Sequence, residues 1–391
     1  MSDAIRHIVV LGAQPEWLSG LRGPMLRDFV ARGYRVTAIG AEEMPAVRAR
    51  LESWGVAYEV VPISRAGLNP LADLSTLVAL YRKLRALRPD LLFAYTIKPV
   101  VYGMPVGWAA GVKRRYAMVP GRGYALLEGR EPSRIVSRFV ATLLYRFGLR
   151  FADGVLFHNE EDIAFFHERR ILKPGANTKR IWGSGVDLEH HRPTVMPAID
   201  AGHPVRFLMI GRMKRDKGVR EFALAAKAIR EAGLPAEFRL VGPTDPSANA
   251  IPLEEIEAWE SDGTLTHLGA LADVRPEIEA AHVVVLPSYA GEGLPRSVLE
   301  GMATGRAIIT TISPGCSDTV EDGISGCLVP VRDHAALAAA MARFIRDEAF
   351  LASAGQRSLA LARERFDVDS VNAEIATFLG LVKRRRTESF E

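Results

Sequence analysis

The sequence predicts an α/β protein built from two Rossmann-like, doubly wound domains in series. Strand-like apolar runs alternate with segments of helical spacing along most of the chain. The alternation stops in a weakly patterned, proline-bearing stretch at residues 191–204, which we interpret as a linker, and then starts again. The length of 391 residues exceeds one ordinary core and suits two domains. We expect domains at residues 1–190 and 191–367, with a C-terminal helix at 368–391 that packs back on the first.

Each domain is expected to contain six parallel strands. In the first domain they lie at residues 7–12, 34–39, 56–61, 89–95, 115–119 and 154–158. In the second they lie at residues 205–210, 237–241, 265–269, 282–287, 306–311 and 326–331. After Asp333 the pattern becomes helical, most clearly at residues 335–346 and 368–382. Ligands bind at the carboxyl ends of such strands, so we expect a site between the two domains.

Composition excludes several classes of protein. Residues are 48% hydrophobic and 25% charged, as in soluble globular proteins. A net charge of +4 does not indicate general nucleic-acid affinity. The only cysteines, Cys316 and Cys327, predict neither a disulfide framework nor a zinc site, and they suit a reducing cytoplasm. No signal-peptide pattern and no apolar run of about 18 residues is present, so any membrane contact is expected to be peripheral.

The segment from Glu292 to Glu300 is the most informative about function. The apolar run at 283–286 predicts a buried strand, and residues 294–304 have helical spacing, which places Glu292 in the loop and Glu300 in the helix. Helical rise puts the two carboxylates about 12 Å apart. Because glycosidase carboxyl pairs lie about 5 to 9.5 Å apart, this pair is expected to hold two ends of an extended ligand. We therefore predict transfer from a long donor rather than hydrolysis.

A second loop, from Gly211 to Gly218, follows the strand at 205–210 and precedes an amphipathic helix. A glycine allows a ligand to approach the backbone, and Arg212 and Lys217 supply two cations near a helix N-terminus. Such a pair can neutralise a departing nucleoside diphosphate without a metal. The alternative is an ordinary solvated basic loop.

Other nucleotide-binding motifs are missing from the sequence. No GxxxxGK[ST] loop occurs, and no GxGxxG follows the first strand, which argues against ATPases and dehydrogenases. The only closely spaced aspartate pair, Asp367 and Asp369, precedes a helix and is better explained by helix capping than by metal binding.

Together, several motifs resemble the family-4 retaining glycosyltransferases, which have the GT-B fold. The matching segments are Gly211-Arg-x4-Lys-Gly218, Pro287-Ser-Tyr, Glu292-Gly-Leu-Pro-Arg-x3-Glu300-Gly-Met-Ala-x-Gly-Arg-Ala-Ile-Ile, Gly315-Cys and Asp322-Gly-x2-Gly-x-Leu-Val. The resemblance implies that Arg212 and Lys217 hold the donor diphosphate beside Gly211, and that Glu292 binds the donor sugar. It also implies donor contacts from Glu300 to the ribose, from the amides around Gly293 and Leu294 to the phosphates, and from His267 and Leu268 near the base. No metal and no cofactor are expected besides the nucleotide-sugar substrate.

The first domain resembles one branch of this family, which adds hexose or N-acetylhexosamine to undecaprenyl-diphosphate-linked sugars. The branch includes the α-1,3-N-acetylgalactosaminyltransferase that acts on N,N'-diacetylbacillosaminyl-diphospho-undecaprenol. The matching segments are 93–103, 119–124, 127–129 and 155–159. Thr96, Lys98, Arg122 and Tyr124 are candidate acceptor-side residues, with ordinary loop chemistry as the alternative. The chain lacks the glycine pair and the histidine that many members carry in this domain, so His158 is the nearest candidate for a catalytic side chain there, and we favour a structural role for it.

A basic amphipathic segment at residues 133–151 is a candidate for contact with an anionic membrane surface. Its apolar residues alternate with Arg134, Arg138, Arg146 and Arg150. The alternative is a surface helix that packs on the core.

The sequence therefore predicts a bacterial transferase that uses a UDP-sugar and a polyprenyl-diphosphate-linked acceptor at the inner face of the cytoplasmic membrane. Three alternatives remain open at this point: a GDP-mannose-dependent transferase, a UDP-sugar 2-epimerase of similar fold, and a non-catalytic sugar-nucleotide-binding protein.

Overall fold

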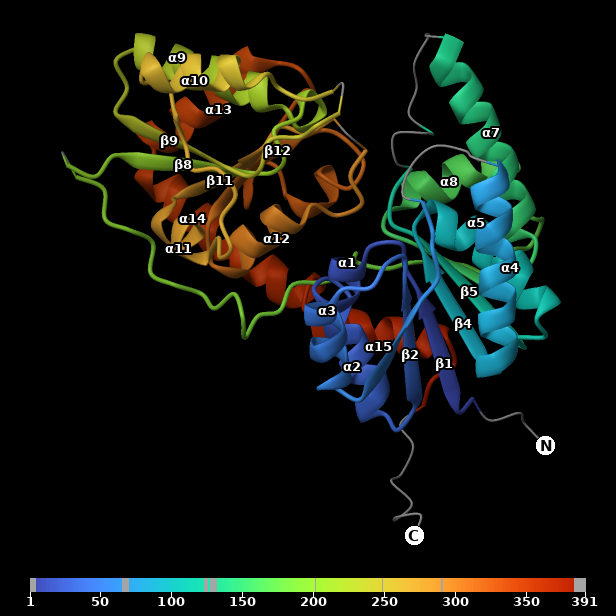
Figure 1. Cartoon of the computed structure of the whole chain (residues 1–391). Coiled ribbons are helices and arrows are strands. Elements are labelled where there is room, and N and C mark those ends of the chain that lie inside the picture. The colour runs from blue at the N-terminus through green and yellow to red at the C-terminus, as the bar shows by residue number, and fades with distance from the viewer. Residues whose placement is uncertain are drawn as a thin grey trace. The chain divides into compact units, whose positions relative to one another are not determined.

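The chain folds into two compact units in the computed structural model, which describes residues 5–64, 70–122, 126, 132–200, 202–247, 249–289 and 291–382. Unit 1 comprises Met1–Ser184 and Asp369–Glu391, and unit 2 comprises Gly185–Val368. Each unit contains one parallel sheet with helices on both faces (Figure 1). The α/β class and the two doubly wound sheets are thus confirmed.

Unit 1 contains a seven-stranded sheet in the order β3-β2-β1-β4-β5-β6-β7. Its strands are β1 (His7–Leu11), β2 (Arg35–Gly40), β3 (Val56–Val60), β4 (Leu91–Tyr95), β5 (Arg114–Val119), β6 (Gly154–Phe157) and β7 (Thr178–Arg180). Its helices are α1 (Pro15–Ser19), α2 (Gly23–Ala31), α3 (Pro45–Glu52), α4 (Pro70–Leu87), α5 (Ile97–Ala109), α7 (Pro132–Leu149) and α8 (Glu160–Glu168). The seventh strand, β7, was not predicted, because three polar-flanked residues at a sheet edge carry no apolar pattern.

Successive residues of the buried strands pack on opposite faces of this sheet. Val9 and Leu11 join the core beneath α4, α5 and α7, whereas Ile8 and Val10 join the core beneath α2 and α3. The C-terminal helix α15 (Val368–Phe378) belongs to the second of these cores through Val371, Ile375 and other residues. Tyr34 fixes the chain end that follows, since its hydroxyl donates to the Val382 carbonyl over 2.9 Å.

Unit 2 contains a six-stranded sheet in the order β10-β9-β8-β11-β12-β13. Its strands are β8 (Val205–Ile210), β9 (Ala236–Val241), β10 (Thr266–His267), β11 (Val283–Leu286), β12 (Ala307–Thr311) and β13 (Gly326–Val329). Its helices are η1 (Arg215–Lys217), α9 (Val219–Glu231), α10 (Leu253–Ser261), α11 (Arg275–Ala280), α12 (Arg296–Ala303), η2 (Ser317–Thr319), α13 (His334–Arg346) and α14 (Glu348–Arg365).

The segment at residues 191–204, which we interpreted as a linker, makes specific contacts within unit 2. It belongs to unit 2, where the buried Arg306 guanidinium donates to the Thr194 side chain and His282 Nε2 lies 3.2 Å from the Pro197 carbonyl oxygen. Its prolines and polar residues hide this role, because the contacts are made by backbone and hydroxyl oxygens rather than by an apolar pattern. Within the described ranges, no helix has the combined length and apolarity to cross a membrane.

Candidate functional site

The candidate site of unit 2 lies at the point where its strand order reverses. β8 pairs with β9 on one side and with β11 on the other, all in parallel. The loops after β8 and β11 leave the same edge of the sheet, which is where ligands bind in open α/β folds. Lys217 belongs to the first loop and Glu292 to the second, so the topology accounts for their meeting.

Gly218 allows the loop after β8 to approach the loop after β11. Its φ is 79°, and a Cβ atom at this position would lie 2.2 Å from the Pro287 carbonyl oxygen. Only glycine fits this conformation and this spacing without strain. The approach is fixed by the Tyr289 amide, which donates to the Asp216 carbonyl over 2.9 Å.

Three side chains meet where these two loops come close together: Lys217, Ser288 and Glu292. The Lys217 ammonium forms an ion pair with Glu292 Oε1, and Ser288 Oγ donates to the same oxygen over 2.7 Å. The Lys217 and Glu292 side chains are 20% and 15% exposed, so the pair is largely shielded from bulk water. The structure thus brings together two of the three predicted catalytic residues.

The Glu292 carboxyl is held in its charged form. Burial by itself would raise its pKa, but the Lys217 ammonium, the hydrogen bonds from Lys217 and Ser288, and the Arg212 charge together lower the pKa below its ordinary value. At neutral pH Glu292 is therefore a carboxylate that can accept hydrogen bonds from hydroxyl groups.

The loop that carries Glu292 is supported by the segment after β12. Gly315 has φ 80°, and a Cβ there would lie 1.8 Å from the Gly293 carbonyl oxygen and 2.4 Å from that of Glu292. Thr311 adds a hydrogen bond to the Ser288 carbonyl. The Gly315-Cys part of the motif therefore acts by backbone approach and not by thiol chemistry.

Arg212 lies on the same loop as Lys217 but is 60% exposed, and its Nη1 is 3.1 Å from Asp245 Oδ2. Asp245 follows β9, and its side chain is only 6% exposed. Burial would raise the pKa of Asp245, yet hydrogen bonds from Ser247 and the Arg212 charge lower it overall. At Gly211 a Cβ would meet nothing within 4 Å, which leaves the backbone open to a ligand beside the Arg212 guanidinium.

Glu300 is buried on α12 and has two neighbours. Arg296 Nε donates to Glu300 Oε1 over 2.7 Å, one helical turn away, and His191 Nε2 lies 3.7 Å from the same oxygen. Burial raises the pKa of Glu300 more strongly than Arg296 lowers it. Burial, together with nearby cations, lowers the pKa of His191 to about 4. His191 is therefore neutral at physiological pH, and its contact with Glu300 is not an ion pair.

The remaining predicted donor residues surround this edge of the sheet. His267 Nε2 lies 3.0 Å from the Gly242 carbonyl oxygen, and the Leu268 amide donates to the Leu240 carbonyl. The amides of Gly293 and Leu294 have no hydrogen-bond partner in the described part of the chain. They precede α12, so they are available to an anion at a helix N-terminus.

In unit 1, Thr96 and Lys98 follow the end of β4. Thr96 has φ 69° and ψ 163°, a conformation that is rare outside glycine and costs about 1–3 kcal/mol. Lys98 is buried: its Nζ lies 2.5 Å from Ser64 Oγ and 3.0 Å from Asp73 Oδ1. The Lys98 cation is thus already paired within unit 1.

Arg122 is paired as well. Its Nε lies 2.6 Å from Oδ1 of the buried Asp162, and its guanidinium covers the Phe165 ring at 4.6 Å. Tyr124 lies outside the described residues. His158 is buried, and burial together with the Arg22 charge lowers its pKa to about 3. Neither ring nitrogen has a hydrogen-bond partner among the described residues, and the structural role that we favoured for His158 stays a prediction.

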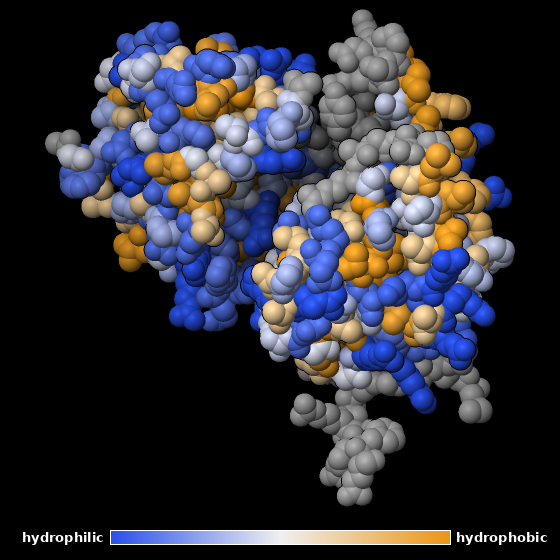
Figure 2. Space-filling view, viewed as in Figure 1, coloured by the Kyte–Doolittle hydropathy of each residue, from blue (hydrophilic) through white to orange (hydrophobic). Residues whose placement is uncertain are grey.

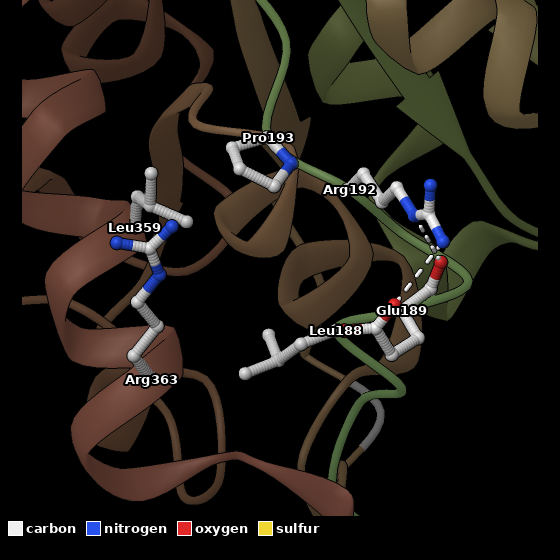
Figure 3. A pocket seen from close by; sticks show the side chains of 6 residues that line it. All are labelled: Leu188, Glu189, Arg192, Pro193, Leu359 and Arg363. Atoms are coloured by element: carbon white, nitrogen blue, oxygen red, sulfur yellow. Dashed lines mark hydrogen bonds and ion pairs between the residues drawn. The ribbon is translucent and has the colours of Figure 1, made fainter.

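One surface pocket of about 660 Å³ lies in unit 2 apart from these residues. Figure 3 shows Leu359 and Arg363 of α14 on one side and the segment from Leu188 to Pro193 on the other. Arg192 is turned toward Glu189, with Nη2 3.1 Å from Oε2. None of the predicted site residues lines this pocket.

Four residues that contact the site were not predicted from the sequence: Ser288, Asp245, Arg296 and His191. Ser288 was part of the Pro287-Ser-Tyr motif, and Arg296 has the i, i+4 spacing to Glu300 that favours a helical ion pair. Asp245 follows a strand and a glycine, as Glu292 does. This similarity could have indicated a role for Asp245. No signal in the sequence points to His191.

Two known families match the chain, one in each unit. Residues 204–347 match the family described as glycosyl transferases group 1, and residues 23–174 match the glycosyl transferase 4-like domain. A relative from Campylobacter jejuni, N,N'-diacetylbacillosaminyl-diphospho-undecaprenol alpha-1,3-N-acetylgalactosaminyltransferase, is 28% identical over 76% of this chain and 79% of its own. The UDP-Gal:alpha-D-GlcNAc-diphosphoundecaprenol alpha-1,3-galactosyltransferase of Escherichia coli is 25% identical over 74% of each chain.

Solved structures share the fold at lower identity. Anabaena HepE in complex with UDP-glucose has a TM-score of 0.72 and 20% identity, covering 96% of this chain and 100% of that one. Sucrose-phosphate synthase from Thermosynechococcus elongatus has a TM-score of 0.75 and 19% identity, covering 95% and 98%. These similarities confirm the expected GT-B fold.

Proposed function

Since the chain belongs to the group 1 glycosyltransferases, the retaining family 4, we propose that it transfers a hexose or N-acetylhexosamine from a UDP-sugar to an undecaprenyl-diphosphate-linked saccharide. The product would serve the assembly of a bacterial surface polysaccharide or glycan. The observation that carries this proposal is the contact of Lys217 and Ser288 with the Glu292 carboxylate at the carboxyl ends of β8 and β11.

Three relatives support the choice of substrates. The names of the Campylobacter and Escherichia relatives each include a diphospho-undecaprenol or diphosphoundecaprenol acceptor, and HepE was crystallised with UDP-glucose. The family-wide fold alone does not select these substrates, so the relatives and the local chemistry together support the proposal.

We assign the donor diphosphate to Lys217, Arg212 and the amides of Gly293 and Leu294. As the glycosidic bond breaks, negative charge grows on the leaving phosphate, and cations fixed in advance stabilise it most. Lys217 is shielded and fixed by Glu292, whereas Arg212 is exposed and can turn from Asp245 toward a ligand. Arginine can then bind two phosphate oxygens at once.

We assign the donor sugar to Glu292 and the ribose to Glu300. Glu292 is ionised, so it accepts hydrogen bonds from sugar hydroxyls while Lys217 remains beside it. Glu300 Oε1 is held by Arg296, whereas Oε2 has no hydrogen-bond partner among the described residues and is therefore open to ribose hydroxyls. His267 and Leu268 are proposed to lie near the base.

On the acceptor side we propose Thr96, Lys98, Arg122 and Tyr124. Lys98 and Arg122 are paired with carboxylates of unit 1. They can contact the acceptor diphosphate either while they keep these partners or in exchange for them. The strained backbone at Thr96 favours a role for this loop beyond connecting β4 to α5. Because the acceptor is lipid-linked, the proposed place of action is the cytoplasmic face of the cell membrane, with the protein bound peripherally.

A donor screen tests this proposal. Purified protein is incubated with UDP-glucose, UDP-galactose, their N-acetyl forms and GDP-mannose, with bacterial membrane extract as the acceptor source, and lipid-linked products are analysed by mass spectrometry. We expect one UDP-sugar to extend a lipid-linked saccharide by one residue. Extension by GDP-mannose alone, or conversion of a UDP-sugar without any lipid-linked product, contradicts the proposal.

A further inference from the structure

Helix α7 has two apolar faces, of which the core covers only one. Ala141, Tyr145 and Leu149 are buried in the unit 1 core. On the opposite side the helix exposes five large apolar side chains, each 48–69% exposed: Ile135, Val136, Phe139, Leu143 and Phe147. At 3.6 residues per turn these five lie within about 120° of one another. An exposed apolar stripe of this length indicates an interaction surface.

The stripe continues onto two neighbouring helices. Trp108 of α5 is 60% exposed, and its ring lies 5.2 Å from that of Phe151, which lies 5.4 Å from that of Phe147. Helix α4 packs against α5 and exposes Leu71, Leu74, Val78 and Tyr81 at helical spacing. Ten of the nineteen exposed large apolar side chains in the described residues are on these three helices. Figure 2 shows hydrophobic residues gathered along this side of unit 1.

Cations lie among these apolar side chains. Arg82 and Arg85 of α4, Arg146 of α7 and Arg150 just after it are all exposed. Helices α5 and α7 contain no aspartate or glutamate, and α4 contains only Asp73, which is ion-paired with Lys98 at 3.0 Å. The surface formed by α4, α5 and α7, here called the α4–α5–α7 face, is thus apolar and cationic.

We propose that the α4–α5–α7 face docks on an anionic lipid bilayer, with the apolar side chains among the acyl chains and the arginines at the headgroup phosphates. This combination is that of helices lying in the plane of a membrane interface. A second copy of the chain fits less well, because it would place arginines opposite arginines and offers no unpaired carboxylate on this face. The inference rests on the proposed function in one respect only, namely that a lipid-linked acceptor places the enzyme at a membrane.

Vesicle sedimentation of the full chain tests the docking surface. We expect binding to vesicles of phosphatidylcholine with phosphatidylglycerol and much weaker binding to phosphatidylcholine alone. The double variant Phe139→Ser, Phe147→Ser is expected to bind the anionic vesicles at least about tenfold more weakly. The reason is that two phenylalanine side chains are no longer transferred from water into the bilayer on binding. The matched control Leu253→Ser, Ile324→Ser removes exposed apolar side chains from unit 2 and is expected to bind as the wild type does.

A charge variant provides a second, independent test. Arg85→Glu with Arg150→Glu leaves the apolar side chains intact and is expected to weaken binding to anionic vesicles about tenfold or more, with a smaller dependence on salt. Thermal melts of all variants check that folding survives. Unchanged vesicle binding of both double variants overturns the proposal. So does a dimer, seen by ultracentrifugation without lipid, that dissociates in the phenylalanine variant.

Transfer to a short-chain, water-soluble acceptor separates this inference from the proposed function. The phenylalanine variant is expected to keep wild-type kcat on that acceptor and to lose transfer only on acceptor embedded in vesicles. If the wild type binds anionic vesicles through this face but transfers no sugar to any acceptor, docking stands and the proposed function fails. Equal loss of transfer on the soluble acceptor overturns the docking role of the two phenylalanines.

Discussion

Units 1 and 2 hold their candidate cations in different ways. In unit 2, Lys217 is paired with Glu292, which is itself a predicted ligand-binding residue. In unit 1, Lys98 and Arg122 are paired with Asp73 and Asp162, which belong to no recognised motif. A donor can bind between or beside the first pair and use both partners. A ligand that takes Lys98 or Arg122 removes a cation from beside a buried carboxylate.

The role of a lysine or arginine in this protein therefore depends on the carboxylate that it is paired with. The Lys98 and Asp73 side chains are only 10% and 13% exposed, and breaking a buried pair is strongly unfavourable because the remaining charge is not compensated. We therefore expect substitutions in unit 2 to affect the chemistry first and substitutions in unit 1 to affect stability first.

The largest effect is expected from the Lys217–Glu292 pair. Lys217→Ala or Glu292→Ala is expected to lower kcat about 100- to 1,000-fold, because a preorganised charge at the leaving phosphate or at the sugar is lost. Circular dichroism should show a retained fold, and the rate is measured by product formation from the donor identified in the screen. Near-normal turnover in either variant would remove this pair from the mechanism.

Gly218→Ala is expected to have the next largest effect. The new Cβ lies 2.2 Å from the Pro287 carbonyl oxygen and φ is 79°, so the loop must shift and Lys217 with it. We expect a loss of about 3 kcal/mol in the free energy of unfolding together with reduced transfer. Gly233→Ala is the matched control, because its φ is 68° and nothing lies within 4 Å of the new Cβ. That variant should lose only about 1 kcal/mol and keep its activity.

Lys98→Met tests the role of the unit 1 pair. It removes the Lys98 cation from beside the buried Asp73 carboxylate, and we expect a loss of about 3 kcal/mol in the free energy of unfolding. The KM for the donor should change little. Urea denaturation and donor kinetics measure the two effects. A variant of wild-type stability with a much raised donor KM would reverse the assignment of the two units.

The effect that is smallest at neutral pH is a pH dependence that both units share. The folded-state pKa of His191 is lowered to about 4 and that of His158 to about 3, from an ordinary value of 6.5. Below pH 6.5 the unfolded chain takes up protons that the folded chain does not, so stability falls as the pH drops from 6.5 toward 4. Each histidine contributes a slope of up to about 1.4 kcal/mol per pH unit.

His191→Phe and His158→Phe test this slope. Each variant is expected to reduce the loss of stability between pH 6.5 and 4, measured by urea denaturation across that range. His191 is in unit 2 and His158 in unit 1, so the two variants report on the two units separately. A slope that neither substitution changes would show that other groups control acid unfolding.

The sequence predicted more of unit 2 than of unit 1 because its site residues lie within short motifs. The loop glycines, Lys217 and the two glutamates have fixed local spacing, and parallel topology brings the strand ends together. The partners of Lys98 and Arg122 come from elements 25 and 40 residues away, and no local pattern connects them. His191 was missed for the same reason, since its stretch resembled a linker and its contact with Glu300 depends on tertiary packing.

Binding of UDP to single variants tests the central claim most directly, because it asks which unit holds the donor. Titration calorimetry is carried out on the wild type, Lys217→Ala and Lys98→Met. We predict that Lys217→Ala weakens UDP binding at least about tenfold, as expected for a lost charge-assisted contact, and that Lys98→Met leaves it unchanged. Wild-type affinity in Lys217→Ala together with lost binding in Lys98→Met would contradict the account.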